Sequence, residues 1–317
     1  MKKIYYSFIG AIILFAFGCQ KGPYPYISLN DVKKIDSAVH PAIKNVAFIY
    51  KNNIYYAADF DKPVVQITTD GSAVKFVKMS HDHSKFAYLN ILNNIVVIDN
   101  KGNNITILSQ YSQVKSFDWS ADDKTLYILN GNAMAYYGPD MNLPAFTYPG
   151  IVNGSTMEVL SASVSMQGDF AYVVHGYNFF DGDKYELVIV PANNGQVKTY
   201  ISDNGSLMDY VNFSSNKQDL VVGYNQSGNN SYTQEKLDLF INLNSSPLGT
   251  FKGASTGAYN SDINYIVGDF LGNNNNTIAP TAVYLGPTSE FQDANIAQNK
   301  VLTQFSSSSH NLYIDWK

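Results

Sequence analysis

The sequence contains no arginine and one cysteine, and each scarcity excludes a class of site. The 21 lysines are not gathered into a basic stripe and the formal net charge is −5, so we expect no nucleic-acid ligand. Without guanidinium groups, bidentate clamps on phosphate or carboxylate cannot form. With Cys19 alone, no intramolecular disulfide is possible.

Catalytic motifs are also missing. The chain has no HExxH, GxSxG or GxGxxG pattern and no glycine-rich phosphate loop, so we predict no cofactor. Glutamate occurs four times, at Glu158, Glu186, Glu235 and Glu290. Asp118 and Asp169 are conceivable catalytic carboxylates, but both adjoin turns, where aspartate ordinarily caps the backbone.

Strand-forming residues are abundant. Hydrophobic residues make up 45% of the chain, with 24 Tyr and 18 Phe, and Asn and Gly punctuate short apolar runs. Such runs bounded by Asn/Gly turns predict antiparallel strands, and no stretch of the mature chain has convincing amphipathic helical periodicity.

The N-terminus has the layout of a targeting signal. Lys2 and Lys3 precede a mostly apolar run, residues 4–17, which is shorter than the ~20 residues that span a bilayer. The run ends in AFGC, residues 16–19. This resembles a bacterial lipoprotein signal, which implies cleavage before Cys19, acylation of that cysteine with diacylglycerol and a fatty acyl chain such as palmitate, and an outer-membrane location. The alternative is an ordinary secretory signal with an incidental cysteine.

A serine-marked hairpin recurs along the chain. FDWSADDKTLYIL places Ser120 between two strand-like runs, and similar stretches recur at intervals of 40 to 49 residues. Their serines are Ser80, Ser120, Ser165, Ser214, Ser261 and Ser306. A degenerate copy ends in the run 46–50, and two further strand-like runs separate successive hairpins. Four strands in each such unit are typical of a β-propeller blade.

The turn Trp119-Ser120-Ala121-Asp122-Asp123-Lys124 resembles the repeat of TolB-type (WD40-like, PD40) propellers, which reads Trp-Ser-Pro-Asp-Gly-Lys. Here Ala121 replaces the proline and Asp123 the glycine. The resemblance covers nearly all of residues 40–317 and implies an all-β fold without implying an activity.

We therefore predict one β-propeller of four-stranded antiparallel blades. Seven hairpins favour seven blades, and six remain possible with the first or last hairpin as an addition. The last unit has only the runs 301–305 and 312–316, so closure requires pairing with N-terminal strands, for which 26–29 and the segment near Ile35 are candidates. The expected divisions are a signal (1–18), a lipidated tether (19–35) and the propeller (36–317).

One face of such a ring is predicted to bind the ligand. The connections 175–184, 225–235 and 269–280 are the longest between second and third strands, and long loops on rigid scaffolds commonly bind. Exposed aromatic side chains beside carboxylates suit sugar rings or a protein hot spot, whereas aromatic residues packed under their own loop are the alternative. The candidates are Tyr177, Phe179, Phe180, Asp181, Asp183, Tyr232 and Phe270.

Histidines gather in turns on the other face. His81, His83 and His310, with His40 and Asp82 nearby in the ring, are weak candidates for a metal site, although turn histidines are usually only solvated. No metal is therefore expected. We predict a lipid-anchored envelope propeller that binds a protein or glycan without catalysis, and the alternative is a propeller hydrolase or lyase acting on polysaccharide.

Overall fold

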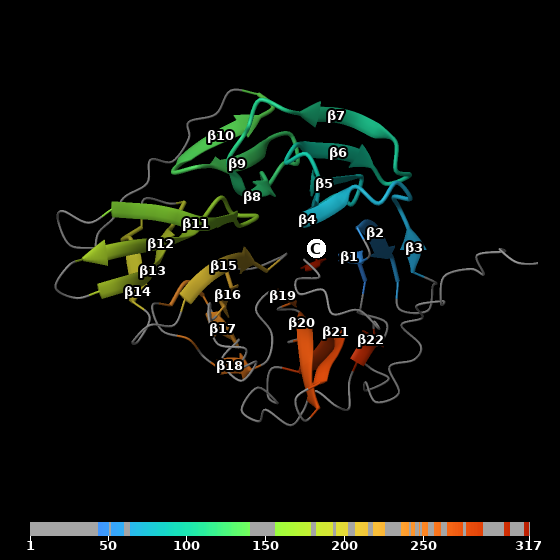
Figure 1. Cartoon of the computed structure of the whole chain (residues 1–317). Coiled ribbons are helices and arrows are strands. Elements are labelled where there is room, and N and C mark those ends of the chain that lie inside the picture. The colour runs from blue at the N-terminus through green and yellow to red at the C-terminus, as the bar shows by residue number, and fades with distance from the viewer. Residues whose placement is uncertain are drawn as a thin grey trace, which may run out of the picture.

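The computed structural model describes these parts of the chain: 44–50, 52–59, 64–139, 156–178, 182–192, 195–201, 207–214, 218–225, 236–240, 242–244, 247, 249–252, 257–260, 265–274, 277–287, 301–304 and 314–316. Their strands form six antiparallel sheets arranged around a common axis (Figure 1). The chain is therefore an all-β propeller, as predicted.

Each sheet is one blade, numbered here in chain order and given from the axis outward. The first three blades are β23 (Ile314–Trp316), β1 (Val46–Tyr50), β2 (Asn53–Ala57) and β3 (Val65–Gln66); β4 (Ala73–Met79), β5 (Lys85–Asn90), β6 (Ile95–Asp99) and β7 (Asn104–Leu108); and β8 (Val114–Trp119), β9 (Leu126–Asn130) and β10 (Ala133–Tyr137).

The fourth to sixth blades each have four strands. They are β11 (Thr156–Val164), β12 (Phe170–Asn178), β13 (Gly182–Val190) and β14 (Lys198–Ile201); β15 (Leu207–Phe213), β16 (Leu220–Asn225), β17 (Lys236–Phe240) and β18 (Gly249–Lys252); and β19 (Gly257–Asn260), β20 (Tyr265–Asn274), β21 (Thr277–Pro287) and β22 (Val301–Gln304).

The ring is closed by its two ends. The inner strands β23, β4, β8, β11, β15 and β19 contact one another in turn, and β19 returns to β23. Within the first blade, β23 pairs with β1 through Val46 and Trp316. Joining the termini in one sheet prevents the ring from opening at a free edge, as the closure prediction required.

Two details of the prediction change. Among the described residues there are six sheets, five of them four-stranded, so the preference for seven blades is not confirmed. The runs 301–305 and 312–316 are not one hairpin: β22 pairs with β21 in the sixth blade, while β23 is the inner strand of the first. The first and last hairpins thus contribute to the same blade. The proposed closing strand 26–29 lies outside the described residues.

Apolar side chains fill the spaces between blades. Strand β5 is buried on both faces, because each blade is covered by its two neighbours, and this explains its continuous apolar run. Between the second and third blades, Leu89 and Val97 lie in one cluster with Phe117 and Trp119. Each such fully buried side chain contributes about 1.5–3 kcal/mol, so the stacking of blades holds the ring together.

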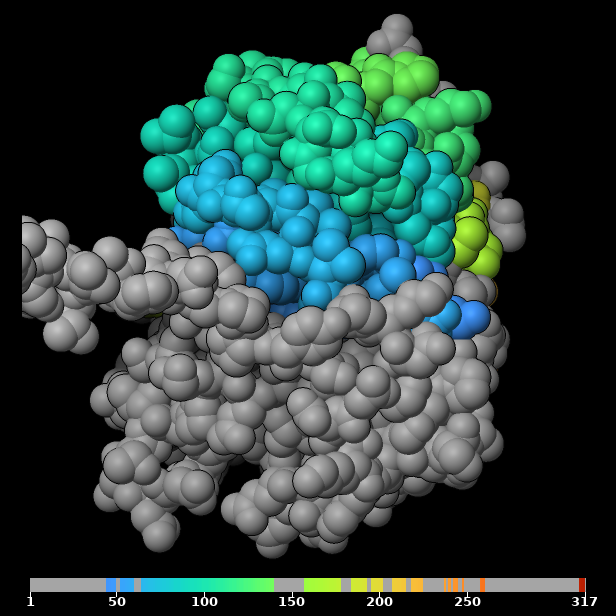
Figure 2. All heavy atoms as spheres, turned by 90° about the vertical axis from the view of Figure 1, so that its right-hand side faces the viewer, coloured from blue at the N-terminus to red at the C-terminus, as the bar shows by residue number. Residues whose placement is uncertain are grey.

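The outer strands are more exposed. Ile105 and Ile107 of β7 are half exposed, because no further strand covers the rim of the second blade. Seen from the side, the blades follow one another as closely packed layers, from blue and cyan to green (Figure 2).

The ring has two distinct faces. Turns from inner to second strands, marked by Ser80, Ser120, Ser165 and Ser214, lie on one face, here the serine-turn face. Because strands alternate in direction, turns from second to third strands lie on the opposite face, here the hairpin face. Lys44 and Trp316 are on the serine-turn face, where the Trp316 indole N–H donates to the Lys44 carbonyl at 2.6 Å.

Candidate functional site

A regular polar ladder joins the inner strands around the axis. In the first, third and fourth blades, the side chain two residues before the turn serine, or at the matching position of β23, accepts a backbone N–H of the next inner strand. These bonds are Asp315 Oδ2 with Met79 N (2.8 Å), Asp118 Oδ2 with Val164 N (3.2 Å) and Ser163 Oγ with Phe213 N (3.0 Å). One repeated position in the sequence therefore links successive blades.

A second rung repeats this arrangement two residues earlier. Ser116 Oγ accepts Ala162 N at 2.9 Å, and Ser161 Oγ accepts Val211 N at 3.2 Å. These side chains satisfy N–H groups that would otherwise be buried without partners between two sheets.

Lys78 occupies the ladder position in the second blade and cannot accept a hydrogen bond. The corresponding N–H, that of Trp119, donates instead to the carboxylate of its own neighbour, Asp118 Oδ1, at 3.0 Å. The Trp119 indole then donates to the Lys78 carbonyl at 3.1 Å. Trp119 of the third blade therefore finds other acceptors for its N–H groups where the second blade has an ammonium group at the ladder position.

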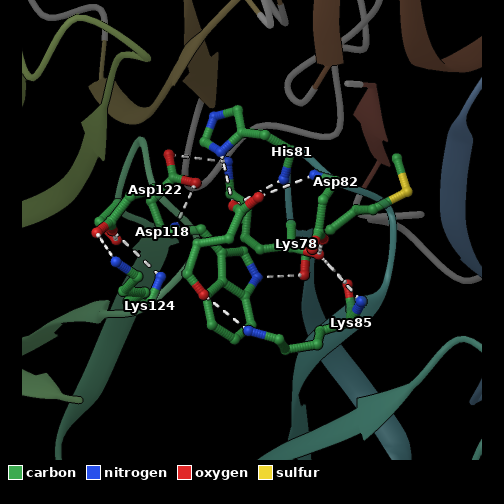
Figure 3. A network of polar contacts seen from close by, with 12 residues as sticks. Lys78, His81, Asp82, Lys85, Asp118, Asp122 and Lys124 are labelled. Carbon is green, nitrogen blue, oxygen red and sulfur yellow. Dashed lines mark hydrogen bonds and ion pairs between the residues drawn. The ribbon is translucent and has the colours of Figure 1, made fainter.

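The Lys78 ammonium reaches across the axis. It donates to Asn212 Oδ1 of the fifth blade, the blade opposite its own, and lies 3.7 Å from both Asp118 Oδ2 and Asp315 Oδ1. The Lys78 side chain is 8% exposed and each carboxylate is 1% exposed. Figure 3 draws Lys78 and Asp118 together with the turn residues His81, Asp82 and Asp122.

Asp118 is thus explained as a structural group. Besides Val164 N, it accepts the Ser163 hydroxyl at 2.6 Å, so it does not cap its own turn as expected from the sequence. The Asp118 carboxylate accepts N–H and hydroxyl hydrogen bonds and lies 3.7 Å from the Lys78 ammonium, and removing one partner of such a buried pair costs about 3–5 kcal/mol. The axis stabilises the ring.

The serines behave as the repeat predicted. Ser80 Oγ accepts Lys85 N at 3.0 Å, and Ser120 Oγ accepts Thr125 N at 3.0 Å. The serine hydroxyl fixes the start of the second strand in each turn. Asp169 belongs to this turn chemistry too, because it accepts the Ser165 hydroxyl at 2.8 Å and Ala192 N at 3.0 Å.

Asp123 connects two neighbouring turns on the serine-turn face. Its φ of 56° is in the left-handed region, where the TolB-type repeat has glycine. Its carboxylate accepts His81 N, Asp82 N and His81 Nδ1, each at 2.8 Å. Lys85 Nζ donates to the Asp123 carbonyl at 2.7 Å and lies 5.0 Å from the centre of the Trp119 ring. Because Asp123 replaces the glycine of the repeat, its carboxylate adds hydrogen bonds between the turns of the second and third blades.

Asp82 lies in the turn from Ser80 to Ser84, which the Asp123 carboxylate contacts. Burial acts to raise its pKa, but hydrogen bonds from Ser80 and Ser84, with the charge of Lys85, lower the pKa to about 2. Asp82 is therefore ionised at neutral pH and engaged within its own turn.

Three of the predicted ligand residues, Tyr177, Asp183 and Phe270, are described, and they belong to hairpins of the hairpin face. Tyr177 lies near the end of β12, opposite Asp183 of β13, and is 52% exposed. The segments 175–184 and 269–280 are not open loops as expected: β12 and β13 pair from Asn178 and Gly182 onward, and β20 and β21 pair as far out as Asn274 and Thr277.

These longer hairpins change the context of the candidate residues. Phe270 is a strand residue opposite Ala282, so it is not at a loop tip. Phe179, Phe180, Asp181 and Tyr232 lie outside the described residues, as does Cys19. Two further exposed apolar side chains, Ile91 (65%) and Leu92 (72%), occupy the β5–β6 turn on the same face.

Two contacts on this face escaped sequence reasoning. The His175 and Tyr185 rings stack with centroids 4.6 Å apart and 15° between their planes, beside Tyr177. Lys115 Nζ lies 2.7 Å from Glu158 Oε1, linking the third and fourth blades. Strand pairing brings His175 opposite Tyr185, and that register is not readable before the hairpin length is known.

Two of the candidate metal-binding histidines, His81 and His83, lie in the described β4–β5 turn. His81 binds Asp123, and His83 has a φ of 59° in the same turn. Within the described parts of the chain, no group of three or more His, Cys, Asp or Glu side chains could hold a metal ion. His40 and His310 lie outside those parts.

Comparison with known proteins gives one partial match. Residues 25–88, about a fifth of the chain, match the family described as the dipeptidyl peptidase IV (DPP IV) N-terminal region. The matched stretch includes β1 to β4 and most of β5. No curated protein matches the sequence. In the described residues, no helix has the length and apolar character needed to cross a membrane.

Proposed function

We propose that this β-propeller is a lipid-anchored, non-catalytic binding module of the cell envelope, attached to the outer membrane through acylated Cys19. Its ligand is a protein or a glycan that binds on the hairpin face. The observation that carries the proposal is the half-exposed Tyr177 ring at the end of a hairpin that extends from the fourth blade. An exposed aromatic ring stacks on sugars or anchors a protein partner.

The axis and the hairpin face carry different kinds of side chain, and this difference supports a binding role for the hairpin face. Asp118 and Asp315, carboxylates on inner strands, are bound to backbone N–H groups and Lys78. The exposed apolar groups Tyr177, Ile91 and Leu92 instead occupy the hairpin face. These two carboxylates are buried at the axis, whereas the exposed apolar groups are accessible to a ligand.

The attachment point is compatible with this orientation. Lys44, the first described residue, is on the serine-turn face, which is the face opposite Tyr177. An anchor attached from the serine-turn face would leave the hairpin face available to a ligand.

The test compares two sets of substitutions in the full-length lipidated protein. Tyr177→Ala, Phe179→Ala and Phe180→Ala together should reduce capture of the ligand from native envelope, or from a glycan array, at least tenfold. The matched control, Ile105→Ala with Ile107→Ala, removes exposed apolar groups from the rim and should leave capture unchanged. Equal capture by all three proteins, with unaltered melting temperatures, would reject the site.

Anchoring is tested separately. Cys19→Ala should move the protein from the membrane fraction to the soluble fraction, because acyl chains contribute about 0.8 kcal/mol per buried methylene. Retention of Cys19→Ala in the membrane would contradict lipidation as the anchor while leaving the binding site untested by that result.

The partial family match favours a second candidate, a propeller that serves a peptidase. Its matched region is named as the N-terminal region of dipeptidyl peptidase IV, so the ligand would be a peptide or a peptidase chain. Release of dipeptides by the purified protein, or capture of a peptidase through the hairpin face, would favour this candidate.

A further inference from the structure

The axis of the ring collects oxygen atoms from three blades around one positive charge. Asn212 Oδ1, Asp118 Oδ2 and Asp315 Oδ1 surround Lys78 Nζ. They come from the fifth, third and first blades, and the ammonium comes from the second. All four side chains are buried, so bulk water does not neutralise these charges.

One oxygen of this group has no hydrogen-bond partner among the described residues. Asp315 Oδ1 is buried and accepts no hydrogen bond from them, although Oδ2 of the same carboxylate accepts Met79 N at 2.8 Å. A buried carboxylate oxygen ordinarily requires a donor or a cation. The positive charge next to it is the Lys78 ammonium, 3.7 Å away, which is beyond hydrogen-bonding distance.

The two carboxylates also exceed the charge of the ammonium. Asp118 and Asp315 together carry two negative charges against one positive charge, and both stand 3.7 Å from Nζ. Within the described part of the chain, the ammonium directly bonds only the amide oxygen, that of Asn212. The arrangement therefore gathers two carboxylates and an amide oxygen, which are donors that divalent cations use, around a monovalent cation.

We propose that the axis is a cation site that this protein fills with the ammonium of its own Lys78, and that the same three oxygens bind a divalent metal ion once the ammonium is removed. Carboxylate and amide oxygens are hard ligands, which select calcium or magnesium. Calcium is the better fit, because it accepts irregular oxygen sites completed by water, whereas magnesium demands near-ideal octahedral geometry. In the natural protein Lys78 excludes the metal, so the ring closes without one.

The experiment uses Lys78→Ala in the otherwise complete chain, with calcium chloride as the probe. At 5 mM calcium we expect one ion to bind per chain by isothermal titration calorimetry, and the melting temperature to rise by about 5 °C or more. Magnesium at the same concentration should give a smaller rise. The natural protein is the first control, and neither calcium nor a chelator should change its melting temperature.

A second variant distinguishes the axial site from surface binding. Lys78→Ala combined with Asp315→Asn keeps the volume of the site but removes one charge, and calcium should bind at least tenfold more weakly. Folding of Lys78→Ala only in the presence of calcium would also support the proposal. A folded Lys78→Ala protein that binds no calcium, equal calcium binding by the Asp315→Asn double variant, or failure to fold with and without calcium would overturn it.

Discussion

Asp123 offers a direct test of how the turns hold neighbouring blades together. The natural residue combines an unfavourable backbone conformation with a favourable carboxylate, and three substitutions separate these effects. Asp123→Gly removes the carboxylate and suits the φ of 56°. Asp123→Ala removes the carboxylate and keeps a Cβ in the left-handed region, whereas Asp123→Asn tolerates that region and retains one acceptor oxygen.

The hydrogen bonds set the size of the effect. The carboxylate accepts three N–H groups at 2.8 Å, two of them from the backbone, and its side chain is 10% exposed. At about 1 kcal/mol for each bond at a turn that water can reach after substitution, Asp123→Gly should lose about 2–3 kcal/mol. The Cβ in the left-handed region costs about 1 kcal/mol, so Asp123→Ala should be less stable than Asp123→Gly by that amount. Asp123→Asn should lose about 1–2 kcal/mol.

Tryptophan fluorescence during urea unfolding measures these differences. The chain has two tryptophans, Trp119 and Trp316, and both are buried on inner strands, so the signal reports on the axis of the ring. The order of stability should be natural protein, then Asn, Gly and Ala. If Asp123→Gly is as stable as the natural protein or more so, the carboxylate contributes nothing and the residue is only a poor replacement for glycine.

Two further predictions concern acid stability and ring closure. The pKa of Asp82 is about 2 in the folded chain, against 3.8 for an unperturbed aspartate side chain, so its stabilisation is complete above pH 4 and is lost as pH falls from 4 towards 2. Asp82→Asn should therefore lower the unfolding midpoint at pH 6 and make it less dependent on pH between 4 and 2, and parallel pH profiles would contradict this reasoning. Deleting residues 314–317 removes β23, the Asp315 carboxylate and the Trp316 bond to Lys44. The shortened chain should lose the cooperative urea transition, whereas Trp316→Phe, which removes only one indole bond, should retain it.

Features that depend on contacts between residues close in the sequence were predicted correctly, whereas features that depend on distant residues were not. Ser80, Ser120 and Ser165 fix turns through contacts a few residues apart, and such contacts repeat in the sequence because the turn repeats. The alternation of apolar runs and Asn/Gly turns likewise identified strands and blades. The number of blades could not be read from these local patterns, because β22 and β23 are neighbours in the chain but belong to different sheets.

The projecting hairpins show the same limit. The sequence predicts a long connection over 269–280, yet Asn273 pairs with Ile278 and Asn274 with Thr277. Backbone pairing across a hairpin can extend a strand through residues of low strand propensity, since partner and context decide the outcome. The positions of Asp183 and Phe270 changed accordingly, from loop to strand.

The sequence by itself determined an all-β chain of repeated blades with the serine turns on one face, because these properties depend on local hydrogen bonds and on the period of the apolar runs. Only the tertiary structure decided that Lys78, Asn212, Asp118 and Asp315 meet at the axis. Lys78 and Asp315 are separated by most of the chain length, and they become neighbours because ring closure brings the last strand beside the first blades. A lone lysine in a strand has no sequence signature that distinguishes a solvated side chain from a buried counter-ion, because the distinction lies in which strands surround it.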